Sequence, residues 1–161
     1  AALMVLEHQV TMTNLITRTG WEARVAPNGA AVKDAAIELV DYLLFVDEAP
    51  LPSPVSGSSG FARTFEARGP HDAKGRSLRQ LDLQRRLLRY PCSYMIYADA
   101  FEQMPAAAKG AVYERLWKVL SGDVRDDLYA RLSKEDRVSI TEILRETKPG
   151  LPDYFNASLI R

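Results

Sequence analysis

The chain has 161 residues, and its 21 basic and 21 acidic side chains give a formal net charge of zero at neutral pH. This balance argues against nucleic acid as a partner and against a polybasic membrane-surface protein, because both normally require a basic excess. No apolar run is long enough to span a bilayer, and the single cysteine, Cys92, excludes a disulfide within the chain.

The first predicted helix covers residues 1–26 and has apolar side chains on two sides. An apolar surface this wide predicts a helix that is buried among several neighbours. No Ser, Thr, Asp or Asn precedes the helix to cap it, so we expect the natural chain to extend upstream. The apolar residues are Leu3, Leu6 and Val10 on one side and Met4, Met12, Leu15 and Ile16 on the other.

Within this helix, Met4, His8 and Met12 are spaced four residues apart in the stretch MVLEHQVTM. Thioether and imidazole groups suit copper(I), and a histidine with a methionine also ligates haem iron. The outer methionines lie about 12 Å apart on a regular helix, so only adjacent residues could share one ion. Core packing is the preferred interpretation, and a haem or copper site that uses His8 with Met4 or Met12 is the alternative.

The second predicted helix covers residues 30–46 and follows the break Pro27-Asn28-Gly29. A Pro-, Gly- and Ser-rich stretch at 47–76 separates it from the third helix. We expect this stretch to be an ordered loop with a short helix that carries Phe61 and Phe65, because unstructured connections of such length are uncommon in compact domains.

Ser77 is a suitable N-cap for a third helix, which has leucines at positions 78, 81, 87 and 88. Pro91 ends or kinks this helix, and helical character then continues to Met104. A fourth helix is predicted from Pro105 to Leu120, and a fifth from Ser133 through Thr147. The pattern therefore predicts a single all-α domain over 1–161, with about five main helices and one long loop between the second and the third.

The third helix would present a basic patch followed by tyrosines, a composition that is frequent at protein interfaces. A solvated face paired with acidic residues is the alternative interpretation. The candidate interface residues are Arg85, Arg86, Arg89, Tyr90 and Tyr94.

The two histidines and one cysteine exclude most catalytic and metal signatures. His71 beside Asp72 is the one pair that could act as an oriented general base, although adjacent residues rarely face each other. We therefore expect no catalytic residues.

The segments RYPCSYMIYADAF, ARGPHDAKGRSLRQLDLQRRL and EILRETKPGLPDYF resemble an uncharacterised family of exported bacterial proteins that are sometimes associated with cytochrome-like sequences. The resemblance implies a periplasmic or otherwise extracytoplasmic bacterial location and assigns no activity. We expect a non-catalytic helical binding or assembly module with a protein partner, as an accessory subunit of a larger bacterial complex and without a cofactor. The alternative is the haem- or copper-binding protein described above.

Overall fold

The computed structural model describes residues 1–124 and 126–157, and within these residues the fold is all-α with no strand. Four long helices build it: α1 (Ala2–Val25), α2 (Ala30–Leu43), α5 (Ala106–Ser121) and α6 (Lys134–Thr147). Shorter elements fill the connections: α3 (Phe61–Glu66), α4 (Asp99–Glu102) and the 3-10 turns η1 (Tyr94–Tyr97), η2 (Asp127–Tyr129) and η3 (Asp153–Asn156). None of the described helices is both long and apolar enough to cross a membrane.

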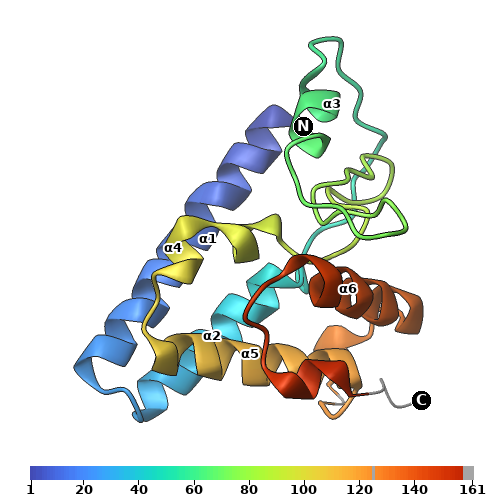
Figure 1. The fold of residues 1–161 in the computed structure, drawn as a ribbon. Helices are drawn as coiled ribbons and strands as arrows, with labels where there is room; N and C mark the ends of the chain where they lie inside the picture. The colour runs from blue at the N-terminus through green and yellow to red at the C-terminus, as the bar shows by residue number, and fades with distance from the viewer. Residues whose placement is uncertain (125, 158–161) are drawn as a thin grey trace.

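The core lies where the long helices meet. After the turn at Pro27, α2 runs back alongside α1. α5 packs mainly on α2 and also touches α1, and α6 packs on α5 (Figure 1). Fully buried side chains from each helix form one continuous apolar cluster, among them Met12, Leu39, Leu116 and Ile140. The predicted all-α fold is therefore confirmed.

The ends of the long helices follow local signals. Ser133 Oγ accepts the Asp136 N–H at 3.0 Å at the start of α6, and Gly122 takes the left-handed φ of 84° after α5. The second helix ends at Leu43, three residues before the predicted end at Val46, and Phe45 takes a φ of 55° that a helix does not allow.

The predicted helix at 77–90 is wrong, because these residues form a non-helical turn that folds back on itself through an antiparallel bridge between Leu81 and Leu88. Asp82 Oδ1 accepts the N–H groups of Gln84 and Arg85, and Leu83 has a φ of 57°. Across the turn, the Arg89 N–H donates to Gln80 O at 2.8 Å. The leucines still point inward, since Leu78, Leu87 and Leu88 are buried, so their burial alone did not define a helix.

The loop at 47–76 is held against this turn and carries the expected short helix α3. The N–H groups of Leu51 and Val55 donate to the carbonyls of Arg85 and Leu83 at 2.9 and 2.8 Å. Phe65 is buried and stacks on Phe61, with 5.6 Å between ring centroids.

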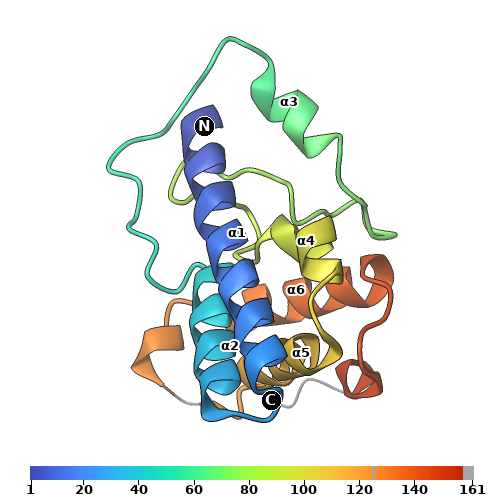
Figure 2. The same cartoon turned by 90° about the vertical axis from the view of Figure 1, so that its left-hand side faces the viewer.

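The first helix is predicted to be buried among several neighbours, and α1 does pack against α2, α4 and α5, but one of its two apolar sides stays exposed. Its inner residues, such as Val5 and Ile16, are buried, but Leu3 keeps 80% of its surface exposed, and Leu6 and Val10 keep 55% each. Figure 2 shows why: α1 lies at the front in this view, and no other element of the described residues passes in front of it.

Candidate functional site: a groove beside His8

A cavity of about 780 Å³ opens between α1, α2 and the segment that follows α2. We call it the His8 groove. Its apolar part includes Met4, Ile37, Tyr42 and Phe45, and six carboxylates also line it: Glu7, Asp34, Glu38, Asp41, Asp47 and Glu48. Among the described residues that line this groove, none is Lys or Arg.

His8 is a buried polar side chain in the lining of the groove. Its ring stacks on Phe45 at 4.5 Å and on Tyr42 at 5.2 Å between centroids. Its Nε2 lies 2.7 Å from Ser93 Oγ, which also accepts the Met95 N–H at 3.1 Å. Burial lowers the pKa of His8 to about 4, so the imidazole is neutral at pH 7.

Three of the carboxylates already have partners. Arg18 pairs with Glu38, the Tyr129 hydroxyl donates to Asp41, and Glu48 accepts the Leu87 N–H at 2.8 Å. Burial raises the pKa of both Asp41 and Glu48, because desolvation disfavours their charged forms.

The other three carboxylates are exposed at the rim. Glu7, Asp34 and Asp47 form no ion pair with any residue that the structure describes. Arg18 offsets the charge of Glu38, and the remaining acids give the groove a negative potential beside an apolar interior.

The residues predicted as metal ligands lie in different surroundings. Met4 lines the groove with His8, whereas Met12 is fully buried in the core. The described residues hold no cluster of three or more His, Cys, Asp and Glu side chains arranged to bind a metal ion. His8 and Met4 therefore share a cavity, and Met12 has the packing role that the preferred interpretation gave it.

The residues predicted as an interface lie on the 77–90 turn and after it, and they do not form one exposed patch. Tyr94 is buried, and Tyr90 is half-buried. Arg86 pairs with Asp136 at 2.9 Å, with its side chain only 23% exposed. Of the three candidate arginines, Arg85 and Arg89 are exposed.

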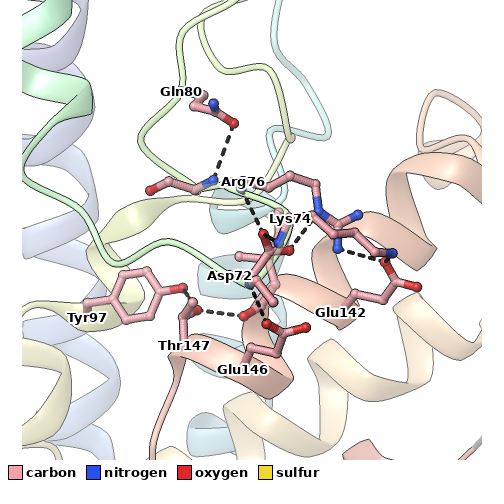
Figure 3. Close-up of polar contacts among 11 residues, drawn as sticks. Asp72, Lys74, Arg76, Gln80, Tyr97, Glu142, Glu146 and Thr147 are labelled. Carbon is pink, nitrogen blue, oxygen red and sulfur yellow. Dashed lines mark hydrogen bonds and ion pairs between the residues drawn. The ribbon is translucent and has the colours of Figure 1, made fainter.

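His71 and Asp72 do not act on each other. His71 is exposed, while the Asp72 carboxylate is fully buried and accepts Arg76 Nε at 2.7 Å and the Arg76 N–H at 2.7 Å (Figure 3). Arg76 in turn pairs with Glu142 of α6 at 2.7 Å. Burial raises the pKa of Asp72, but its hydrogen bonds and ion pair with Arg76 outweigh this effect and hold the pKa below its usual range. The network fastens the loop to α6.

The sequence contains one signal for the groove beyond the candidate residues named above. Asp34, Glu38 and Asp41 follow each other at helical spacing and place three carboxylates on one face of α2. Their position beside His8 depends on how α1 packs on α2.

Comparisons with models of protein families, with curated proteins and with solved structures found no match to this chain.

Proposed function

We propose that this chain is a non-catalytic helical binding module, and that the His8 groove holds an organic cation with an apolar body. The observation that carries this proposal is the pairing of six carboxylates with an apolar cavity whose lining, among the described residues, contains neither Lys nor Arg. A cation entering such a groove gains Coulomb attraction, and its apolar part leaves water.

The size of the cavity favours a small molecule. Its volume of about 780 Å³ falls in the range of about 300–1,000 Å³ that is typical of small-molecule sites. The aromatic residues Tyr42 and Phe45 suit ligands that carry a substituted ammonium group, because aromatic faces attract such cations.

The groove is built before a ligand arrives. The stack of His8 on Phe45 and Tyr42 and its hydrogen bond to Ser93 fix the side chains of the interior. A preorganised site loses less conformational entropy on binding.

No separate observation favours the haem or copper alternative. The extracytoplasmic bacterial location and the role as an accessory subunit also stay predictions.

The test uses benzyltrimethylammonium as the cationic probe and benzenesulfonate as an anion of similar size. We expect the cation to bind, as measured by calorimetry, and to shift the NMR signals of His8 and Tyr42. The double variant Glu7→Gln/Asp34→Asn removes two exposed carboxylates of the rim and should weaken binding about tenfold.

The matched control is Asp123→Asn/Asp153→Asn, which removes two exposed charges outside the groove. It should leave the affinity within about twofold, since exposed charges at a distance are screened by salt. Equal binding of the two probes, or equal loss of affinity in the two double variants, would contradict the proposal.

A further inference from the structure

One face of α1 is apolar and uncovered, although the rest of the helix belongs to the core. We call it the α1 outer face. It runs the length of the helix, and in Figure 2 no helix or loop of residues 1–124 and 126–157 lies in front of it. At the far end from Leu3, Trp21 keeps 63% of its surface exposed and Val25 keeps 66%. The face consists of Leu3, Leu6, Val10, Asn14, Thr17, Trp21 and Val25.

The order of residues along this face suits pairing with an inverted copy of itself. The large apolar side chains lie at the two ends, and the smaller polar Asn14 and Thr17 lie between them. When two copies pack antiparallel about an axis near Thr13, Trp21 of one copy lies level with the gap between Leu3 and Leu6 of the other. Each end then covers the apolar end of its partner.

The same register also pairs opposite charges. Glu7 and Arg18 lie along the same edge of the α1 outer face. The two-fold axis places Glu7 of each copy beside Arg18 of the other, so the dimer contains this charge pair two times. Glu7 forms no ion pair with a described residue. Arg18 holds Glu38, but its guanidinium has five donors and can hold a second carboxylate.

We infer that the α1 outer face is a self-association surface, on which a second copy of this chain packs antiparallel through Leu3, Leu6 and Trp21. A lipid surface fits less well. Helices that lie on membranes are typically rich in Lys and Arg on their polar side. In α1, Arg18 and Arg24 are balanced by Glu7 and Glu22. This inference does not rest on the ligand of the His8 groove.

The first test measures mass against concentration by sedimentation equilibrium. The protein should form a dimer, and either Leu6→Lys or Trp21→Lys should raise the dissociation constant at least about tenfold, because a buried apolar contact is replaced by a charge. The matched control is Leu128→Lys, which makes the same exchange at an exposed leucine of η2, away from α1. A monomer at all accessible concentrations, or a dimer that these α1 variants leave unchanged, would overturn the inference.

The second test determines the orientation. Asn14→Cys places a thiol near the two-fold axis, so mild oxidation should link two copies through it. Leu3→Cys places the thiols roughly 29 Å apart in the antiparallel pair, so it should give no such link. The native Cys92 is fully buried and does not compete. Linkage through Leu3→Cys would indicate a parallel pair, and partition of a monomer onto phosphatidylcholine vesicles would indicate a lipid surface. Either result overturns the inference.

Discussion

The imidazole Nε2 of His8 lies 2.7 Å from the hydroxyl Oγ of Ser93, a residue 85 positions later in the chain. The contact joins α1 to the start of η1. Both side chains are buried, so this hydrogen bond replaces those that their polar atoms lose to water on folding.

This contact makes the protein sensitive to mild acid. The pKa of His8 is about 4 in the folded chain, because burial disfavours the imidazolium, and about 6.5 in an unfolded chain. As the pH falls through 6.5, the unfolded state therefore takes up a proton before the folded state does. We expect the free energy of unfolding to fall by about 2–3 kcal/mol between pH 7 and pH 4.5 through this group.

Denaturant titrations at the two pH values test this prediction. His8→Gln should be less stable at pH 7, and it should lack this part of the pH dependence. His71→Gln changes the exposed histidine and should keep the full dependence. If the free energy of unfolding changes with pH equally in His8→Gln and in the unmodified protein, another group causes the pH dependence.

The buried ion pair of Asp72 and Arg76 should contribute strongly to stability. Asp72→Asn keeps the size of the side chain but removes the charge that faces Arg76 Nε at 2.7 Å. We expect a loss of about 2–3 kcal/mol, because the guanidinium is largely buried and keeps only Glu142 as a charged partner. Lys74→Ala removes an exposed pair to Glu142 and should cost less than about 1 kcal/mol. Thermal unfolding of both variants checks the ranking, and equal losses would contradict it.

Gly69 lies where the loop passes close to the next segment. A Cβ at this position would meet Ser77 Oγ at 2.6 Å and Arg79 Cδ at 2.7 Å. Arg79 lies over the rings of Phe65 and Tyr94, so displacing it disturbs the packing of α3. We expect Gly69→Ala to destabilise the fold by about 1–3 kcal/mol.

Gly110 provides the matched control for this change. It lies inside α5 with nothing within 4 Å of an added Cβ. Gly110→Ala should therefore stabilise the protein by about 0.5–1 kcal/mol, because alanine loses less backbone entropy in a helix. Chemical denaturation of the two variants should show shifts of opposite sign, and shifts of the same sign would refute the steric argument.

The arginines of the 77–90 turn should divide into structural and surface residues. Arg86→Glu places a carboxylate against Asp136, which Arg86 now holds at 2.9 Å, and it should destabilise the fold by about 2 kcal/mol or more. Arg85→Glu and Arg89→Glu change exposed side chains and should each stay within about 0.5 kcal/mol. Melting temperatures of the three variants test this. If a partner does bind these arginines, the two surface variants should weaken that binding without loss of fold.

The long helices could be predicted from local information. Helical spacing of apolar residues, the break at Pro27, the cap at Ser133 and the stop at Gly122 each act within a few residues, so the sequence around them was sufficient. The chain also contained three carboxylates at helical spacing on α2, which form half of the acids that line the His8 groove.

Only the tertiary structure decided the rest. At 77–90 a tertiary contact joins the local hydrogen bonds of Asp82, because the carbonyls of Leu83 and Arg85 pair with the distant loop at 51–55. The His8 groove required the packing of α1 on α2 and the left-handed backbone at Phe45. The exposure of Leu3 and Trp21 depended on which side of α1 the other helices cover, because periodicity identifies an apolar face without identifying what packs on it.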